Sequence, residues 1–374
     1  MTLADQAETS GHQPGGGATR LLVLLGDGIG PEIVAATIDV LREADRLFGL
    51  DLQYEWAAIG TASLKAVGTT VTNDVVAQAK RADGVILGPV SHNEYPPASQ
   101  GGLNPSGELR KRLDLFANIR PARSRAGLPA RCGRDIDLVI VRENTEGFYA
   151  DRSMHMGPGE FMPTPDTALS VRKITREGSE RIAETAFSIA ARRRRKVTVV
   201  HKANVLRLSE GFFLECVRRV AARYPDVACE ERLVDAMAAL LIRDPGQFDV
   251  IVTTNMFGDI LSDEASEIAG SLGLGASLNA GRQFAVAQAQ HGSAPDIAGR
   301  DLANPASLIE SAAMLLLWLE ERGRGEKFAA AGRRIMQAVD AAIAVPEHRT
   351  RDLGGPLGTN AFAAHVIAGL ADQK

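Results

Sequence analysis

The sequence contains few cysteines, and their spacing excludes two classes of protein. Three cysteines occur among 374 residues, namely Cys132, Cys216 and Cys229. Cysteines that are odd in number and far apart provide neither the disulfide framework of a small secreted protein nor a CxxC metal site. A reducing compartment, the cytoplasm, is therefore the expected location.

The sequence also lacks an excess of positive charge and a long apolar segment. The formal net charge of -4 does not favour a nucleic-acid partner, although it is compatible with a small anionic substrate. The longest apolar stretch, Ala312–Leu319, is much shorter than the roughly 20 residues that span a bilayer. Residues 1–20 lack the apolar core of a signal peptide and are interpreted as a flexible leader. We interpret the basic run Arg192–Lys196 as a solvated helix end, and we expect neither a nucleic-acid nor a membrane partner.

Apolar runs alternate with longer helical patterns, which is typical of an α/β fold. Because 45% of the residues are hydrophobic, the chain can bury a sizeable core, and its length favours two domains over one. The expected strands are Leu21–Leu25, Gly84–Leu87, Leu138–Val141, Val197–Val200 and Val250–Val252. Polar residues follow each strand at once, and open α/β sheets bind their ligands at the carboxyl ends of strands.

A glycine-rich turn, Gly26–Gly30, connects the first expected strand to a helix. Pro31 and Glu32 are suited to the first turn of that helix. The glycine spacing differs from the GxGxxG of a Rossmann site, and no phosphate-binding lysine follows. The turn either approaches a ligand or simply needs glycine for its backbone conformation.

Three arginines, Arg110, Arg120 and Arg142, are candidates for binding carboxylates. Arg110 and Arg120 lie on either side of the run LDLFAN, and Arg142 ends a strand. A guanidinium group binds a carboxylate through two parallel hydrogen bonds, so converging arginines would suit a di- or tricarboxylate. Taken one at a time, each arginine is also compatible with an ordinary surface charge.

Two aspartates, Asp259 and Asp263, follow the last expected strand in a probable helix. Their spacing places both carboxylates on one helix face, about one turn apart. A hard cation such as Mg²⁺ or Mn²⁺ would relieve the repulsion between them, and Asp235 could supply a third oxygen ligand. The alternative is that both are solvated helix charges with a capping role.

Lys202 and Tyr149 are candidates for proton transfer. Lys202 follows a buried strand, where desolvation and nearby charges can shift the pKa of its amine. Tyr149 is one of four tyrosines and could donate a proton, although a lone Tyr or Lys is more often structural. The irregular loop His291–Gly299, followed by Asn304, is rich in small residues that let backbone approach a flat ligand; the alternative is a plain surface loop.

These segments together resemble the β-decarboxylating dehydrogenases, the family of isocitrate, homoisocitrate, isopropylmalate and tartrate dehydrogenases. The resemblance runs from about Leu21 to the segment Asp352–Gly355. The motifs that carry it are GDGIGPE, LDLFANIRP, RENTEGFY, HKANVL, TTNMFGDILSD and HGSAPDIAG, which occur in the family's order and spacing. The resemblance implies oxidation of a substituted malate with loss of its β-carboxylate.

The resemblance also implies an isopropylmalate dehydrogenase-like two-domain α/β fold with a non-Rossmann nucleotide site. Residues 21–117 and 270–374 would form a large cofactor-binding domain. Residues 118–269 would form a small domain with the dimer interface and the metal ligands. Two subunits complete each active site in this family, so a homodimer is implied, with Lys202 and Asp235 lent by the partner.

Site residues are implied by the same motifs. Arg110, Arg120 and Arg142 match the clamp on the substrate carboxylates, and Asp235, Asp259 and Asp263 match the Mg²⁺ or Mn²⁺ ligands. Lys202 would accept the hydroxyl proton and Tyr149 would reprotonate the enol carbon. The residues that match the adenosine site of the family are His291, Gly292, Ser293, Ala294, Asp296, Ile297 and Asn304.

The resemblance implies NAD as the cofactor, on the evidence of a few residues. Asp296 is placed to accept the ribose hydroxyls of NAD, and NADP-dependent relatives have Lys and Tyr at Asp296 and Ile297. This chain has Gln288 where the family usually has a glutamate near the nicotinamide ribose. The departure predicts a different affinity for the cofactor or a different placement of it, and a non-catalytic relative is the alternative.

The substrate-binding residues implied by the resemblance also include Asn104, Ser106 and Asn204. The polar Asn104 and Ser106 before the first clamp arginine favour an isocitrate- or homoisocitrate-like substrate, because burying them unpaired against an isopropyl group costs about 1–3 kcal/mol. Isopropylmalate and tartrate remain alternatives. The stretch Ser91–Pro97 matches no pattern that we can assign.

Overall fold

The structure, a computed structural model, describes residues 17–149, 154, 157 and 159–371. Most of the expected leader, residues 1–16, lies outside the described residues. The first strand begins at Thr19, two residues earlier than expected, and Thr19 is buried in the sheet. Thr19 and Arg20 therefore belong to the fold and not to a leader.

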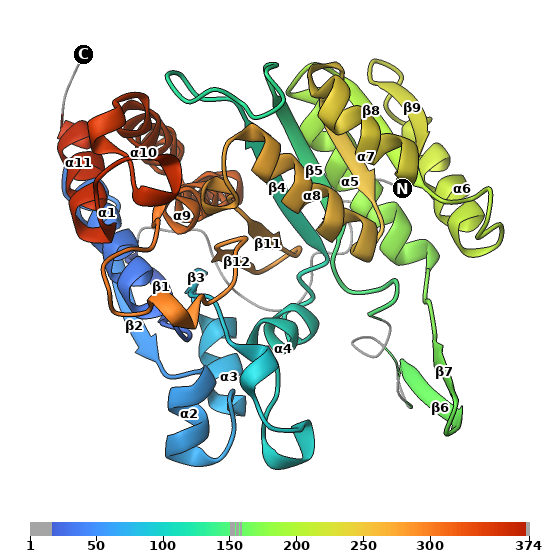
Figure 1. The fold of residues 1–374 in the computed structure, drawn as a ribbon, viewed down its shortest axis with the longest axis horizontal. Coiled ribbons are helices and arrows are strands. Elements are labelled where there is room, and N and C mark those ends of the chain that lie inside the picture. Colours follow the sequence, from blue (N-terminus) through green and yellow to red (C-terminus); the bar gives the residue numbers. More distant parts are fainter. Residues whose placement is uncertain (1–16, 150–153, 155–156, 158, 372–374) are drawn as a thin grey trace.

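One mixed sheet of ten strands runs through the molecule (Figure 1). Its strands are β1 (Thr19–Leu24), β2 (Leu52–Ala57), β3 (Gly84–Leu87), β4 (Ala117–Arg123), β5 (Asp137–Glu143), β8 (Lys196–His201), β9 (Ala228–Leu233), β10 (Val250–Thr253), β11 (Leu278–Ala280) and β12 (Ala285–Gln288). Their spatial order is β2-β1-β3-β12-β11-β4-β5-β10-β8-β9. All of the expected strands are present, most of them one or two residues longer than expected.

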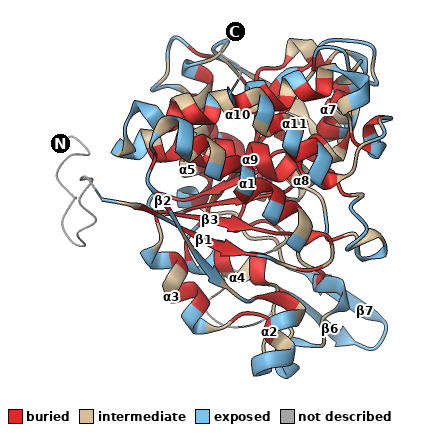
Figure 2. Ribbon diagram, turned by 90° about the vertical axis from the view of Figure 1, so that its left-hand side faces the viewer, coloured by how far each residue is buried: buried red, intermediate tan, exposed pale blue. Residues whose placement is uncertain are grey.

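The sheet consists of two parallel blocks joined by antiparallel strands. The strands β2, β1, β3 and β12 are parallel neighbours, and so are β5, β10, β8 and β9. Between the blocks, β11 pairs antiparallel with β12 and β4, and β4 pairs antiparallel with β5. A separate hairpin, β6 (Glu160–Thr164) and β7 (Thr167–Ser170), is exposed throughout (Figure 2).

Helices connect the strands and cover the sheet. They are α1 (Gly30–Phe48), α2 (Gly60–Val67), α3 (Asn73–Arg81), α4 (Pro105–Arg112), α5 (Arg176–Ala191), α6 (Ser209–Ala221), α7 (Val234–Arg243), α8 (Asn255–Ala269), α9 (Ala306–Leu319), α10 (Glu326–Ala344) and α11 (Thr359–Ala371). As expected, α1 follows the glycine turn and has Pro31 in its first turn. Within the described residues, none of these helices combines the length and apolar character needed to cross a membrane.

Buried apolar side chains form separate cores for the chain ends and the chain middle. Two clusters draw their buried members from residues 21–115 and 274–370, and two others from residues 116–269. Figure 1 shows the same separation, because the blue and red elements lie together on one side and the green and yellow ones on the other. This distribution is in line with the expected domain boundaries, which remain a prediction.

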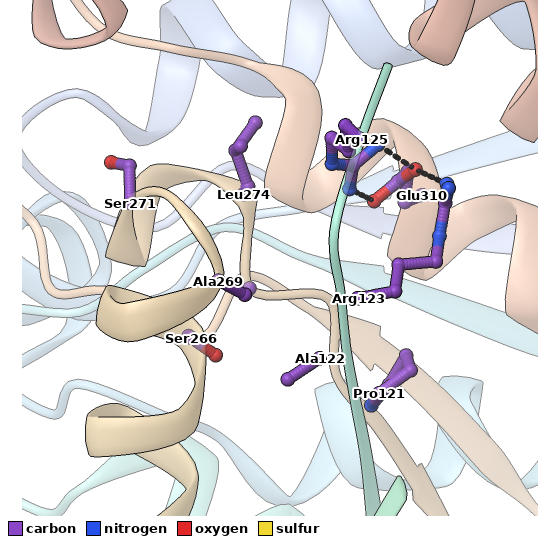
Figure 3. Close-up of a pocket in the computed structure, with 10 residues that line it drawn as sticks. Pro121, Ala122, Arg123, Arg125, Ser266, Ala269, Ser271, Leu274 and Glu310 are labelled. Atoms are coloured by element: carbon purple, nitrogen blue, oxygen red, sulfur yellow. Dashed lines mark hydrogen bonds and ion pairs between the residues drawn. The ribbon is translucent and has the colours of Figure 1, made fainter. Parts of the chain in front are cut away.

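At the end of β4, charged side chains connect the middle of the chain with the helices α9 and α10. Arg125 donates to Glu310 at 2.5 Å and to Asp340 at 2.6 Å, and Arg123 donates to the same two carboxylates (Figure 3 shows both arginines with Glu310). The Arg125 and Glu310 side chains are 3% and 5% exposed. A buried cation and anion need each other because neither is solvated, so this cluster fixes β4 against α9 and α10.

The basic run after α5 is largely exposed, as expected, but two of its arginines also bind neighbouring groups. Arg193 donates to Asp249 and Asp137, each at 2.8 Å. Arg194 donates to backbone carbonyls of the segment before β10, including that of Gly246 at 2.9 Å. These two arginines therefore attach the end of α5 to neighbouring loops and are not simply solvated.

Candidate active site

Arg142 and α8 meet at the carboxyl ends of two neighbouring strands. Arg142 lies in β5, which pairs in parallel with β10, and α8 begins directly after β10. Asp259 and Asp263 lie on α8, as the sequence predicted. A Cβ atom on Gly258 would lie 2.6 Å from Cβ and Cγ of Arg142. Glycine is therefore needed at this position for α8 to pack against Arg142.

Two buried arginines bind the side chains of α8. Arg142 donates from Nε and Nη2 to Oδ1 of Asn255, at 2.9 and 2.6 Å, and from Nη1 to Asp259. Arg120 donates to Ser262 at 2.7 Å and to Asp263 at 3.2 Å, and its Nη1 lies 3.3 Å from Asp259.

The charges in this cluster are unequally exposed. The side chains of Arg120 and Arg142 are 6% and 3% exposed, whereas those of Asp259 and Asp263 are 38% and 52% exposed. Burial lowers the pKa of the Arg120 guanidinium, and the two carboxylates oppose that effect. The cluster thus presents carboxylates outward over a buried cationic floor.

Helix α4 carries Ser106 and Arg110 one turn apart on one face. Ser106 donates to Oε1 of Gln288 at 2.9 Å, so Gln288 lies beside the expected substrate residues. The side chain of Asn104 accepts a hydrogen bond from the Gly107 amide at 3.1 Å and caps α4. Sequence reasoning assigned Asn104 to the substrate, but its side-chain oxygen is occupied by the helix.

The loop that carries Tyr149 is hydrogen-bonded to a buried carboxylate, that of Glu143. Glu143 accepts hydrogen bonds from the Thr145 amide and hydroxyl, at 2.9 and 2.7 Å, and from the Glu146 amide at 2.7 Å. Burial raises the pKa of Glu143 despite these bonds. Tyr149 is half-buried and close enough to Arg120 to affect it electrostatically.

Lys202 and Asp235 form a second, separate group. Lys202 follows β8, Asp235 lies in the first turn of α7, and their side chains are 2.6 Å apart. The hydrogen bond from Lys202 lowers the pKa of Asp235. Within the described part of this single chain, no three His, Cys, Asp or Glu side chains gather to hold a metal, so Asp235 does not join Asp259 and Asp263. Asn204 is exposed near Lys202.

The expected cofactor loop packs against the glycine turn. The carbonyl of Ser293 accepts from the Ile29 amide at 2.8 Å, and a Cβ atom on Gly28 would lie 2.0 Å from that carbonyl oxygen. The glycine in the turn is therefore required by close backbone contact. Ala294 adopts a left-handed conformation, with φ of 37°, and Asp296 and Ile297 lie in the short turn that follows.

His291 and Asn304 differ in how many hydrogen-bond partners their side chains have. Nδ1 of His291 is 3.0 Å from the Gly292 carbonyl oxygen, while Nε2 is buried and has no hydrogen-bond partner among the residues that the structure describes. Burial lowers the pKa of His291. Asn304 donates to Asp352 at 3.1 Å and accepts from the Ala306 amide at 3.0 Å, so it fixes the end of the loop.

Sequence reasoning missed three residues beside this loop. Asp27, within the glycine turn, accepts hydrogen bonds from the amides of Thr61 and Ser91 and from the Tyr95 hydroxyl. Ser91 is also 2.8 Å from the Ser293 hydroxyl. The unassigned stretch Ser91–Pro97 thus supports the turn and the loop. The sequence signal for this role was that the stretch begins a few residues after the end of β3.

The side chains present are suited to a metal ion and a nucleotide. Asp259 and Asp263 offer the hard oxygen ligands that Mg²⁺ and Mn²⁺ prefer. Among the described residues of one chain, no third His, Cys, Asp or Glu side chain completes the pair. The buried, unpartnered Nε2 of His291 can receive a hydrogen-bonding group of a nucleotide. The contact between Gly28 and Ser293 shows that the backbone of the glycine turn lies directly against the backbone of the His291 loop.

Comparison with known proteins identifies one family. The family model described as isocitrate/isopropylmalate dehydrogenase matches residues 20–366. The chain belongs to this family. It is 38% identical over 354 residues to the 3-isopropylmalate dehydrogenase of Methanothermobacter thermautotrophicus, with 94% of this chain and 99% of that relative covered. It is 41% identical over 355 residues to the isocitrate/homoisocitrate dehydrogenase of Thermus thermophilus, with the same shares covered.

A solved structure supports the same assignment. The isocitrate dehydrogenase from Methylococcus capsulatus has a TM-score of 0.84 and 38% identity, and the match covers 95% of this chain and 100% of that one. The expected family, fold class and enzyme class are confirmed. The chain is a dehydrogenase of a family that oxidises and decarboxylates hydroxy acids.

Proposed function

We propose that this protein is an NAD-dependent, Mg²⁺- or Mn²⁺-requiring homodimeric enzyme that oxidises and decarboxylates a 3-substituted malate. The observation that carries the proposal is the cluster of buried Arg120 and Arg142 beneath the outward carboxylates of Asp259 and Asp263. Such a cluster combines cations for substrate carboxylates with oxygen ligands for a metal. A cytoplasmic location remains the expectation from the cysteine content.

The residues of the chain would act in sequence on a bound malate. Arg110, Arg120 and Arg142 bind the substrate carboxylates and hold the reacting carbons in place. Lys202 accepts the proton of the C2 hydroxyl as the C2 hydride leaves. The β-carboxylate then departs as carbon dioxide, its bonding electrons form an enolate, and Tyr149 donates a proton to the enolate carbon. A metal ion bound by Asp259 and Asp263 would supply polarisation of the C2 oxygen, and a nicotinamide cofactor bound at the His291 loop would supply the hydride acceptor.

The proposed cofactor site is formed by the His291 loop. Asp296 is exposed in the turn after Ala294, where its carboxylate can accept the ribose hydroxyls of NAD. The backbone of the glycine turn at Gly28 lies against the backbone of the His291 loop, next to the left-handed Ala294. We assign Gly292, Ser293 and Ile297 to this site as well.

The proposed homodimer is supported by separate catalytic groups and by exposed apolar side chains. Lys202 with Asp235 forms one group and Asp259 with Asp263 another, as expected if each active site combines residues of two subunits. Three apolar side chains of the β6–β7 hairpin, namely Phe161, Met162 and Leu169, are 45%, 63% and 47% exposed. Phe161 and Leu169 are paired across the hairpin, and exposed apolar side chains that gather in this way are typical of a protein interface.

A polar substituent on the malate is favoured over an aliphatic one. Ser106 and Gln288 are both buried and hydrogen-bonded to each other next to Arg110. An isopropyl group would leave their remaining hydrogen-bonding capacity unused, whereas a carboxylate would use it. An isocitrate- or homoisocitrate-like substrate is therefore proposed. The relatives of this chain include enzymes named for both of these substrates and for 3-isopropylmalate.

Turnover of a substrate panel tests the proposal. Isocitrate, homoisocitrate, 3-isopropylmalate and tartrate are assayed with NAD and Mn²⁺ by NADH and carbon dioxide formation. We expect both products in equal amounts, with the highest kcat/KM for one of the tricarboxylates. A higher kcat/KM for 3-isopropylmalate or tartrate would overturn the substrate assignment. No turnover of any malate would instead favour a non-catalytic relative.

A further inference from the structure

A buried ion pair, Arg172 with Glu210, lies outside the residues assigned to substrate, metal and cofactor. Arg172 lies between β7 and α5, and Glu210 lies in the first turn of α6. Their side chains are 7% and 0% exposed, and a guanidinium nitrogen of Arg172 donates to Oε1 of Glu210. The pair is therefore shielded from solvent on both sides.

Glu210 holds the backbone from which Lys202 projects. Its second oxygen, Oε2, accepts a hydrogen bond from the Lys202 amide at 2.7 Å. This bond forms immediately after β8, where the chain leaves the sheet. Because the two oxygens of one carboxylate bind Arg172 and the Lys202 backbone, the position of Arg172 influences the position of Lys202.

Arg172 holds the loop that carries Tyr149. Its guanidinium carbon lies 5.2 Å from the ring centres of both Phe148 and Phe257. Phe148 directly precedes Tyr149, and the adjacent Gly147 forms two backbone hydrogen bonds with Lys173, at 2.8 and 2.9 Å. The planar cation thus contacts one aromatic ring next to Tyr149 and another in α8.

Stability alone does not account for a cation at this place. Nε and Nη1 of Arg172 are buried and have no hydrogen-bond partner within the described residues. A buried guanidinium with unsatisfied donors costs free energy, and an apolar side chain could fill the space between two rings without that cost. What an apolar side chain could not do is bind the Glu210 carboxylate and the Thr254 hydroxyl, to which Nη2 of Arg172 also donates at 2.8 Å.

We propose that Arg172 and Glu210 are positioning residues shared by both proton-transfer residues of a subunit. The inference rests on the proposed function, in which Tyr149 acts in the subunit's own site and Lys202 acts in the partner's site. One ion pair then supports a residue of each active site. It joins the two sites of the dimer by a continuous set of contacts.

Hybrid dimers separate the two roles of the pair. A hybrid of Tyr149→Phe and Lys202→Met subunits retains one intact site, made of Tyr149 from the second subunit and Lys202 from the first. Arg172→Met is then introduced into one subunit or into the other. In the first subunit it disturbs the support of the working Lys202, and in the second it disturbs the support of the working Tyr149.

We expect kcat to fall about tenfold to a hundredfold in both arrangements, because each misplaces a group responsible for proton transfer. The substrate KM should stay within about threefold, because the carboxylate clamp is untouched. Arg172→Lys keeps a charge for Glu210 and should restore part of kcat. The matched control is Arg176→Met, because Arg176 also lies over a phenylalanine ring, that of Phe212 at 4.9 Å, but is exposed.

The possible results differ in what they contradict. A loss of kcat in only one arrangement, or in neither, would overturn the shared role of the pair. A loss of kcat with Arg176→Met equal to that with Arg172→Met would also overturn it. If verified hybrids of Tyr149→Phe and Lys202→Met show no activity before Arg172 is changed, the shared-site assignment itself is wrong, and the inference fails with it. If Arg172→Met does not fold, the comparison is made with Arg172→Lys, for which an unchanged kcat in either arrangement counts against the proposal.

Discussion

Asp259 shows how one side chain takes part in two sets of interactions. It receives a hydrogen bond from Arg142 and lies beside Arg120, yet its side chain is 38% exposed. The two guanidinium groups orient its carboxylate, while its exposure leaves it accessible to a metal ion. Its contribution is therefore expected to be larger for catalysis than for folding.

We predict that Asp259→Asn lowers kcat/KM by about two orders of magnitude or more, because a metal ligand loses its charge. The free energy of unfolding should fall by about 1–3 kcal/mol, because two buried guanidinium groups lose a charged partner but Asn still offers Arg142 a hydrogen-bond acceptor. The matched control is Glu267→Gln on the same helix, whose exposed pair with Arg131 is 2.9 Å long. Activity that is insensitive to EDTA would contradict the prediction.

Asp296 should decide between the two nicotinamide cofactors. Its carboxylate would accept ribose hydroxyls from NAD but would repel the 2′-phosphate of NADP. Because about 1.4 kcal/mol corresponds to about tenfold in affinity, a like-charge contact of several kcal/mol gives strong discrimination. We expect the double variant Asp296→Lys with Ile297→Tyr to shift the preference toward NADP.

The cofactor prediction is checked by kcat/KM for NAD and NADP in both proteins. The exposed Arg300 lies four residues after Asp296 and could bind the phosphate, so Arg300→Met serves as the control. Equal efficiency with NADP in the unmodified protein would be incompatible with the assignment.

At the scale of elements, the position of α4 depends on its cap. Asn104 accepts a hydrogen bond from the Gly107 amide, and Ser106 and Arg110 lie on the helix that this bond stabilises. Replacing a cap by alanine costs about 1 kcal/mol, whereas serine is an equally good cap. The role of Asn104 can therefore be read from the difference between two substitutions.

We predict that Asn104→Ala lowers the Tm and raises the substrate KM, and that Asn104→Ser changes both much less. Thermal unfolding and steady-state kinetics measure the two effects. If both variants raise KM equally without a change in Tm, Asn104 binds the substrate directly and the capping role is secondary.

At the scale of the whole molecule, the exposed hairpin connects the fold of one chain with a second subunit. The β6–β7 pair projects from the rest of the chain and makes its own two-stranded sheet (Figure 1). An isolated hairpin of this size is marginally stable in water. Contact with a second copy would bury its apolar side chains and stabilise it.

We predict that Met162→Glu weakens the dimer and lowers activity at low protein concentration, because each site needs residues of both subunits. Val67→Glu is a matched control, since Met162 and Val67 are both 63% exposed and Val67 lies on α2, away from the hairpin. Sedimentation measures the oligomeric state. A dimer that is equally stable in both variants would remove the hairpin from the interface.

The central antiparallel strands were beyond the reach of sequence reasoning. β4 contains Pro121, which usually argues against a strand inside a sheet. In the fold, β11 pairs with β4 only through residues 117–119. Pro121 lies beyond the end of β11, so its missing backbone N–H leaves no carbonyl of β11 without a hydrogen bond. Whether a proline is tolerated in a strand thus depended on the length of a neighbour more than 150 residues away.

The sequence by itself determined the α/β class, the main strands and the candidate groups at their ends. These features follow from apolar periodicity and from residues near one another in the chain. Only the tertiary structure decided that Asp259 and Asp263 lie over Arg120 and Arg142, while Asp235 lies beside Lys202. It also decided that Asn104 caps a helix and that Tyr95 supports the glycine turn. These contacts depend on strand order and burial, which join residues that no local pattern relates.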